Sequence, residues 1–302
     1  MTLPNFIIIG AAKSGTTSLY KYLQEHPDVY VSPQKEPRFF AVLSDFNKVV
    51  GNDEDQKRLW GDSITTLEDY IALFDGVRHE KAIGEASPIY IWSKDAPNNI
   101  KKYLPEVKLI AILRHPVDRA FSHYLHNLKI GLEKNSSFED ALTDDEQRHY
   151  AEYLPQGWYA MLLRRYFDFF PADRIKVFLY DDLVNDPAGL MRTIYQFIGV
   201  DDSFSGNVQK IHNASGFSKS RIVDNLFGNS VYQTAMQKIL PGSVKDMIDD
   251  FVRKKNTVKP KIDLQTAHRL QALFLDEISD LQSLIGRDLT PWLEKYSTPP
   301  QA

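Results

Sequence analysis

Residues 6–18 read FIIIGAAKSGTTS, and this stretch decides the fold. Residues 6–9 are apolar and form a short buried strand, which ends at a glycine. A lysine, a second glycine and three hydroxyl residues follow. A helix that begins near Thr16 points its first free N–H groups at any anion held in the loop. The stretch therefore predicts a strand, an anion-binding loop and a helix.

This loop departs from the P-loop of nucleotide-hydrolysing enzymes at its lysine. That P-loop follows the pattern G-x-x-x-x-G-K-[ST], in which the lysine comes after the second glycine. Here Lys13 lies between Gly10 and Gly15, and Thr16 stands at the usual lysine position. The pattern indicates a phosphate-like anion and argues against ordinary ATP chemistry. A P-loop kinase or nucleotidase with a displaced loop lysine stays open as the alternative.

Composition limits the architecture. The chain has 302 residues, 43% of them apolar and 12% aromatic, which is enough for a large core. We expect a single domain over residues 1–302, with a helical C-terminal elaboration over about 222–296. The chain contains no cysteine, which excludes disulfides, thiolate zinc sites, iron–sulfur clusters and a cysteine nucleophile.

Charge and the N-terminus restrict partners and location. Lysine and arginine number 36 against 40 aspartates and glutamates, a formal charge of −4 that lacks the basic excess of nucleic-acid binders. The start MTLPN has no basic segment of the signal-peptide type, and the apolar run over residues 6–12 is too short to cross a bilayer. We therefore expect a soluble, cytoplasmic protein with no transmembrane segment and no nucleic-acid partner.

Strand and helix patterns alternate along the chain, which is typical of a parallel sheet covered by helices on both faces. The sequence thus predicts an α/β protein with a P-loop-like, three-layer α/β/α fold. The expected strands span residues 6–10, 81–85, 108–113 and 176–180. The expected helices span residues 16–26, 67–74, 95–104, 117–129, 138–150, 158–169 and 187–198.

Two helices have particularly clear signals. The helix over residues 187–198 has Asp186 as its N-cap, a proline at its first position and Gly199 just past its end. In the tail, apolar residues recur at helical spacing from Leu264 to Ile285, and Gly286 follows. This stripe predicts a helix packed on the core rather than a partner-binding helix.

A second anion site is indicated at the end of the strand over residues 108–113. Arg114 follows this strand, where a nucleotidase usually carries an aspartate that organises magnesium. The carboxyl ends of parallel strands line the ligand crevice of an open α/β sheet, so Arg114 is placed to hold an anion. Ser122, about two turns into the next helix, adds a hydroxyl for the same anion.

The chain resembles the sulfotransferases that use 3′-phosphoadenosine 5′-phosphosulfate (PAPS). The segment IIIGAAKSGTTSL looks like the family's 5′-phosphosulfate loop, and LIAILRHPVDRAFSHY looks like its 3′-phosphate motif. Further matching segments extend the resemblance in patches over about residues 5–221: HPDVYVSPQKEPRFF, IGEASPIY, GWYAMLLRRYFDFFPADRIKVFLYDDL and HNASGFSKSR. The KEPRFF segment is most similar to the heparan-type, glycosaminoglycan-modifying branch.

The resemblance implies an enzyme that moves a sulfuryl group from PAPS to an acceptor hydroxyl and releases 3′-phosphoadenosine 5′-phosphate (PAP), without a metal. Lys13 would neutralise charge on the donor's bridging and 5′-phosphate oxygens. The donor-binding residues would be Lys13, Ser14, Gly15, Thr16, Thr17, Ser18, Arg114, Ser122, Lys219 and Arg221. The acceptor would be a glycan, a lipid or a small-molecule alcohol.

The same resemblance makes Glu36 the catalytic base that takes the acceptor's proton. A carboxylate is a weak base unless its pKa is raised, and Phe39 and Phe40 would supply the apolar surroundings. The alternative for Glu36 is an ion pair with Lys35 or Arg38. His115, His123 and His126 are rival bases, since the family's cytosolic branch uses a histidine.

Three assignments are weaker. Glu85, at the end of a strand, would face the acceptor, although a structural role is as well supported. Tyr159 would pack near the donor. Asp181, in VFLYD, resembles a metal-binding carboxylate, but the sulfotransferases have a similar acidic turn without metal.

Overall fold

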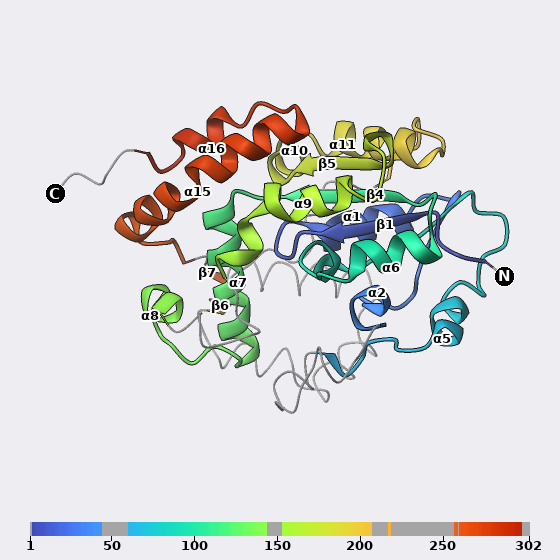
Figure 1. Cartoon of the computed structure of the whole chain (residues 1–302), viewed down its shortest axis with the longest axis horizontal. Helices are drawn as coiled ribbons and strands as arrows, with labels where there is room; N and C mark the ends of the chain where they lie inside the picture. Colours follow the sequence, from blue (N-terminus) through green and yellow to red (C-terminus); the bar gives the residue numbers. More distant parts are fainter. Residues whose placement is uncertain are drawn as a thin grey trace, which may run out of the picture.

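A sheet of five parallel strands lies at the centre of the computed structural model, which describes residues 2–43, 60–143, 153–206, 217–218, 257–258 and 260–297 (Figure 1). The strand order is β2-β3-β1-β4-β5. These strands are β1 (Phe6–Gly10), β2 (Val29–Val31), β3 (Ala82–Ala86), β4 (Lys108–Leu113) and β5 (Ile175–Leu179). A short antiparallel pair, β6 (Phe217–Ser218) and β7 (Thr257–Val258), lies apart from this sheet. The predicted α/β fold with a parallel sheet is confirmed.

Helices cover both faces of the sheet, because alternate residues of each buried strand point to opposite sides. Phe6 and Ile8 of β1 belong to one apolar core, whereas Ile7 and Ile9 belong to the other. The first core is closed by α1 (Thr16–Gln24), α10 (Tyr180–Asn185) and α11 (Pro187–Ile198). The second is closed by α2 (Phe39–Val42), α5 (Leu67–Ala72), α6 (Ala96–Tyr103), α7 (Pro116–Ile130), α8 (Phe138–Thr143), α9 (Tyr159–Phe167), α15 (Leu264–Ile285) and α16 (Thr290–Glu294).

Most predicted elements occur within a few residues of their expected bounds, and α11 matches its prediction at both ends. Strand β2 was missed because three residues are too few to show an alternating pattern. The end of β5 was also placed wrongly. Tyr180, expected in the strand, begins α10, whose first turn is fixed by Asp182 accepting a hydrogen bond from the Leu179 N–H at 2.9 Å. The expected helix over 138–150 is described only as far as Thr143.

The tail stripe packs on the core as predicted. In α15 the buried apolar residues are Ala267, Leu270, Phe274, Ile278 and Leu281. Figure 1 shows α15 and α16 beside α10, and polar contacts join them. Arg287 forms a forked ion pair with Asp182 at 2.9 and 3.1 Å, and Trp292 Nε1 donates to Asp181 at 2.8 Å. The acidic turn at the start of α10 thus anchors the C-terminal helices.

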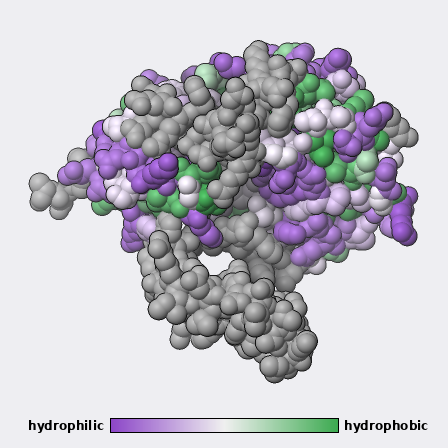
Figure 2. Space-filling model, turned by 90° about the horizontal axis from the view of Figure 1, so that it is seen from below, coloured by the Kyte–Doolittle hydropathy of each residue, from purple (hydrophilic) through white to green (hydrophobic). Residues whose placement is uncertain are grey.

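The described surface is mainly hydrophilic on the face shown in Figure 2, with hydrophobic residues in small patches. Exposed large apolar residues include Met161 and Leu264, at 53% and 58% exposure. Among the residues that the structure describes, no helix is both long and apolar enough to span a bilayer. The single domain over residues 1–302 stays a prediction.

Candidate functional site

The glycine loop leaves the sheet at the carboxyl end of β1, next to β4. The Ala11 N–H donates to the Ile112 carbonyl of β4 at 2.8 Å, which ties the loop to the neighbouring strand. Arg114 is the residue that follows β4, and α7 then runs away from the sheet (Figure 1). The two sequence motifs, about a hundred residues apart, therefore meet at one edge of the sheet.

Gly15 ends the loop in a conformation that suits glycine alone. Its φ is 98°, and an added Cβ would lie 2.5 Å from Leu183 Cδ2 and 3.2 Å from the Tyr180 ring. Gly15 is also the N-cap of α1, so no side chain caps the helix, and the first turn contains no acidic residue. The first N–H groups of α1 are consequently left to other acceptors, which is the condition for anion binding.

Lys13 lies in this loop with a left-handed backbone, at φ 66°. Burial lowers the pKa of its ammonium to about 8, against the opposing attraction of Glu36. Within the described ranges, no carboxylate lies within ion-pair distance of Lys13. A partly buried cation without a partner is costly in the free protein and becomes favourable when an anion binds.

Arg114 reaches the same loop from the other side. Its Nη1 donates to the Lys13 carbonyl at 3.4 Å, and its guanidinium lies 4.9 Å from the centre of the Tyr180 ring. The Tyr159 hydroxyl donates to the Arg114 carbonyl at 2.9 Å, so Tyr159 supports the backbone of this residue. Arg114 forms no ion pair with a carboxylate of the described residues.

The predicted hydroxyl donors differ in exposure. Ser14, Thr16 and Ser18 are buried, whereas Thr17 is half-exposed. Ser18 hydrogen-bonds the Tyr22 side chain within α1, which gives it a structural contact. Ser122 is buried on α7, at 3% exposure. Donor binding by these residues stays a prediction.

Glu36 lies on a strained segment between β2 and α2. Glu36 and Arg38 have φ values of 69° and 56°, and with Lys13 they are the non-glycine residues with positive φ in the described ranges. Such strain tends to gather at functional sites. The Glu36 carboxylate accepts from Lys35 Nζ at 3.1 Å and from Arg38 Nη2 at 3.4 Å.

These ion pairs decide the acidity of Glu36. Burial raises its pKa, but Lys35 and Arg38 outweigh burial and hold the pKa below the usual range. Phe39 and Phe40 are core residues that pack against Tyr70 with ring centres 4.6 and 5.1 Å away. The expectation that phenylalanines raise this pKa is wrong, and both ion pairs foreseen as the alternative are present.

Glu85 is fully buried in the free protein. The residue has no exposed surface, and its carboxylate accepts from Ser87 Oγ at 2.8 Å and from Tyr70 Oη at 3.3 Å. Burial raises its pKa to about 7. This burial favours the structural role that the sequence left open for Glu85, and its assignment as an acceptor contact stays a prediction.

The three histidines have different surroundings. His115 is buried against the rings of Trp292 and Tyr296, and burial lowers its pKa to about 4. Burial also lowers the pKa of His123 well below its usual value and that of His126 to about 4. The charge of Lys13 acts in the same direction on both. The His126 ring, on α7, is partly desolvated but keeps the most exposed surface of the three, so His126 is the histidine best placed to reach a substrate as a rival base.

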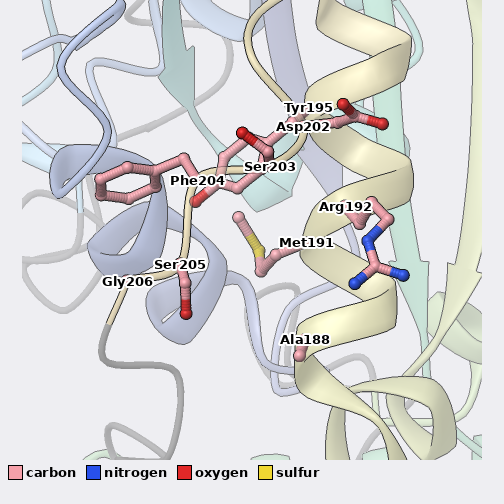
Figure 3. A pocket seen from close by; sticks show the side chains of 9 residues that line it. All are labelled: Ala188, Met191, Arg192, Tyr195, Asp202, Ser203, Phe204, Ser205 and Gly206. Atoms are coloured by element: carbon pink, nitrogen blue, oxygen red, sulfur yellow. The ribbon is translucent and has the colours of Figure 1, made fainter.

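Two other features of the described residues lie apart from this site. A pocket of about 70 Å³ lies between α11 and the segment that follows it, and its lining includes Met191, Arg192, Tyr195 and Phe204. Figure 3 shows these side chains. The pocket lies at the opposite end of α1 from the loop, since His26 contacts Asp201 there. No group of three or more potential metal ligands occurs in the described ranges. Lys219 and Arg221 lie outside the described residues.

Sequence reasoning missed the groups that support the site. Tyr180 lies beneath Arg114. The charge of Lys129, on α7, also reaches Lys13. The basic residues on each side of Glu36 were the signal for its ion pairs, which were foreseen only as the alternative to a catalytic role. The remaining contacts depend on segments far apart in the chain.

Comparison with known proteins places the chain among sulfotransferases. A family model described as "Sulfotransferase family" matches residues 4–204. A crystal structure of a sulfotransferase from Alicyclobacillus acidocaldarius is 30% identical, covers 97% of this chain and 99% of that one, and superposes with a TM-score of 0.74. The sulfotransferase domain of the Synechococcus PCC 7002 olefin synthase, 19% identical, covers 95% of this chain and 96% of that one with a TM-score of 0.51, which supports the fold alone.

Curated relatives include much longer proteins. The human bifunctional heparan sulfate N-deacetylase/N-sulfotransferase 3 is 29% identical over 206 residues, which cover 66% of this chain and 22% of that protein. The mouse N-deacetylase/N-sulfotransferase 4 is 26% identical over 307 residues, 97% of this chain and 31% of that protein. The chain thus spans less than a third of the length of these two relatives.

Proposed function

The chain belongs to the sulfotransferase family, and we propose that it transfers a sulfuryl group from PAPS to a hydroxyl or amine group of an acceptor, releasing PAP. Family membership agrees with the PAPS-dependent sulfotransferase predicted from the sequence. The kinase or nucleotidase alternative loses its support, because the residue that follows β4 is Arg114 rather than a metal-holding carboxylate.

One observation carries the proposal: Lys13 and Arg114 lie at the edge of the sheet without carboxylate partners among the described residues, beside the uncapped start of α1. Two cations and a set of free N–H groups suit a ligand with phosphate groups at separate positions. PAPS has a 5′-phosphosulfate and a 3′-phosphate. The residues present therefore fit this donor, with Lys13 and α1 toward the phosphosulfate and Arg114 toward the 3′-phosphate.

The chemistry then divides between two side chains. A bond forms between the acceptor oxygen or nitrogen and sulfur, while the bond between sulfur and the 5′-phosphate oxygen breaks. Lys13 and the first N–H groups of α1 neutralise the charge left on that phosphate oxygen. Glu36 receives the proton that the acceptor loses. These roles stabilise charge that is present only as the reaction proceeds, which is the requirement for rate enhancement.

Glu36 is ionised in the free protein but is a weak base there. Its ion pairs with Lys35 and Arg38 keep the carboxylate deprotonated and its pKa low. A bound acceptor that takes over one of these cations weakens the pairing and raises the pKa of Glu36. The carboxylate then accepts a proton more readily, since base strength rises with pKa.

We assign a carbohydrate as the acceptor. The support is the resemblance of the KEPRFF segment to the heparan-type branch and the names of the N-sulfotransferase relatives. Lys35 and Arg38, each about one-fifth exposed (20% and 23%), supply donors beside Glu36 for a polar acceptor.

Radiolabelled PAPS tests the reaction and the acceptor together. The protein is incubated with de-N-acetylated heparosan, which offers amines, with N-acetylated heparosan, which offers hydroxyls, and with a small phenol. We expect label on one of the two glycans and none with the Lys13→Ala variant. Label on the phenol alone would support sulfuryl transfer from PAPS but would contradict the assignment of a carbohydrate acceptor.

A thermal-shift measurement tests donor binding separately. A ligand of the folded state raises stability by RT ln(1 + [L]/Kd). We expect PAP to raise the melting temperature and ATP with magnesium to have little effect. A rise in melting temperature with ATP and magnesium but not with PAP would favour the kinase or nucleotidase alternative instead.

A further inference from the structure

A buried carboxylate lies directly behind the Glu36 segment, and sulfuryl transfer does not use it. Glu85, in β3, has no exposed surface, and its oxygens are surrounded by hydroxyl groups. Ser87 Oγ donates to Oε2 at 2.8 Å, Tyr70 Oη donates to Oε1 at 3.3 Å, and the Tyr90 hydroxyl also hydrogen-bonds the carboxylate. A buried carboxylate is tolerated only with such donors, so this cluster has a reason to be ordered.

Two of these hydroxyls also hold backbone N–H groups of the Glu36 segment. The Arg38 N–H donates to Ser87 Oγ at 3.1 Å, and the Phe40 N–H donates to the Tyr90 hydroxyl at 3.4 Å. A hydroxyl that accepts from an N–H group keeps its own proton to donate. Ser87 and Tyr90 therefore connect two backbone N–H groups to one carboxylate.

The segment held in this way is strained. Glu36 and Arg38 adopt left-handed backbone conformations that side chains disfavour. Its carbonyl groups are held elsewhere, because Ile64 N–H donates to the Pro37 carbonyl at 2.8 Å and Asn99 Nδ2 donates to the Phe40 carbonyl at 2.9 Å. The N–H groups of Arg38 and Phe40 depend instead on the hydroxyls bound to Glu85.

From this geometry we propose that Glu85 is a positioning residue: through Ser87 and Tyr90 it fixes the backbone at Arg38 and Phe40 and thereby sets the direction of the Glu36 side chain. The catalytic consequence rests on the proposed function. The structural statement does not, because it concerns hydrogen bonds within the protein.

Tyr70 provides a matched control. It hydrogen-bonds the same carboxylate, but among the described residues its hydroxyl makes no hydrogen bond to the backbone of the Glu36 segment. Its ring stacks on Phe39 at 4.6 Å, and Tyr70→Phe keeps that contact. The control removes one donor to Glu85 and leaves both backbone connections in place.

The first readout is amide hydrogen exchange in peptides that span residues 36–40. We expect Ser87→Ala and Tyr90→Phe to speed exchange of the Arg38 and Phe40 amides by about tenfold or more, since each amide loses its acceptor. Ser87→Thr keeps the hydroxyl and should restore slow exchange, because the backbone of Ser87, at φ −128°, accepts a branched residue. Tyr70→Phe should leave exchange in this segment unchanged.

The second readout separates turnover from donor binding. We expect kcat to fall by about tenfold or more in Ser87→Ala, because a misdirected base loses much of its effect, while PAP affinity stays within about twofold. Tyr70→Phe should keep kcat within about twofold at a temperature where both variants are folded. Glu85→Gln should resemble Ser87→Ala in both readouts if it folds.

The inference is overturned if exchange at Arg38 is unchanged in Ser87→Ala, or if Tyr70→Phe lowers kcat as much as Ser87→Ala does. Failure of the proposed function has a different signature. In that case the unaltered protein transfers no label from PAPS, and the exchange comparison still decides whether Glu85 holds the segment.

Discussion

The cations at the carboxyl edge of the sheet and those of the C-terminal helices are in opposite situations. Arg287 forks onto Asp182, and Lys295 pairs with Asp118. Lys13 and Arg114 have no such partner among the described residues. The first pair of cations joins parts of the fold, whereas the second pair is left available to a ligand.

This difference shows that the site is identified by which cations lack a partner, and that the net charge of the chain gives no sign of it. The chain is acidic overall, at −4. Even so, burial lowers the pKa of Lys13 to about 8, which means that the folded protein is less stable when Lys13 is protonated. A protein that keeps such a cation unpaired gives up some stability for binding, a common compromise at functional sites.

The largest expected effect comes from removing the unpaired lysine. Lys13→Ala should lower kcat for sulfuryl transfer by about 10²–10³-fold, because charge on the leaving phosphate oxygen is no longer neutralised. Its free energy of unfolding, measured in urea at pH 7, should stay equal or rise. A clear loss of stability would show that Lys13 is paired like the cations of the C-terminal helices.

Glu36→Gln should have a similar or somewhat smaller effect on rate. Loss of a general base costs about 10²–10⁴ in rate, and the lowered pKa of Glu36 makes it a weak base, so we expect a loss toward the lower end of that range. PAP affinity, measured by titration calorimetry, should not change, because Glu36 is assigned to the acceptor side. Undiminished turnover would show that Glu36 is not the catalytic base, and the histidines near Arg114, first of all His126, would be tested next.

PAP affinity should fall as pH rises past about 8. The free protein loses the Lys13 proton near that pH, and a bound phosphate raises the lysine's pKa, so binding takes up a proton above it. Calorimetry between pH 7 and 9.5 in buffers of different ionisation enthalpy measures this uptake. The Lys13→Arg side chain stays charged over this whole range, so this variant should bind PAP with no such pH dependence. A pH dependence that persists in Lys13→Arg would show that another group titrates.

The smallest effect is expected for a paired cation. Arg287→Ala removes a partly exposed ion pair, with 40% of the arginine side chain exposed, and should cost about 0.2–1 kcal/mol of unfolding free energy. Its kcat should equal that of the unaltered protein at temperatures where both are folded. A large loss of turnover would mean that the C-terminal helices act on the site, and Lys295→Ala would test the same point independently.

The local motifs of this chain could be predicted from its sequence, whereas the contacts between distant segments could not. The loop before α1 and the arginine after β4 were placed correctly because a strand, a glycine turn and a helix start are encoded by adjacent residues. The choice between an acceptor contact and a structural role for Glu85 could not be made from the sequence, because a strand's sequence gives the alternation of its side chains but not the depth at which each is buried. Glu36 was expected to lie in apolar surroundings, and its ion pairs depend on a left-handed turn that the sequence does not signal.

By itself the sequence determined the alternating α/β architecture, the anion-binding loop and the family, since these depend on short-range periodicity and contiguous motifs. Only the tertiary structure decided which charges are paired, that Lys13 and Arg114 share one edge, and that Glu85 lies behind Glu36. The physical reason is that solvation and hydrogen bonding of a side chain depend on residues brought near it by folding, about 50 to 100 positions away in the chain, as for Arg38 with Ser87 and Lys13 with Arg114.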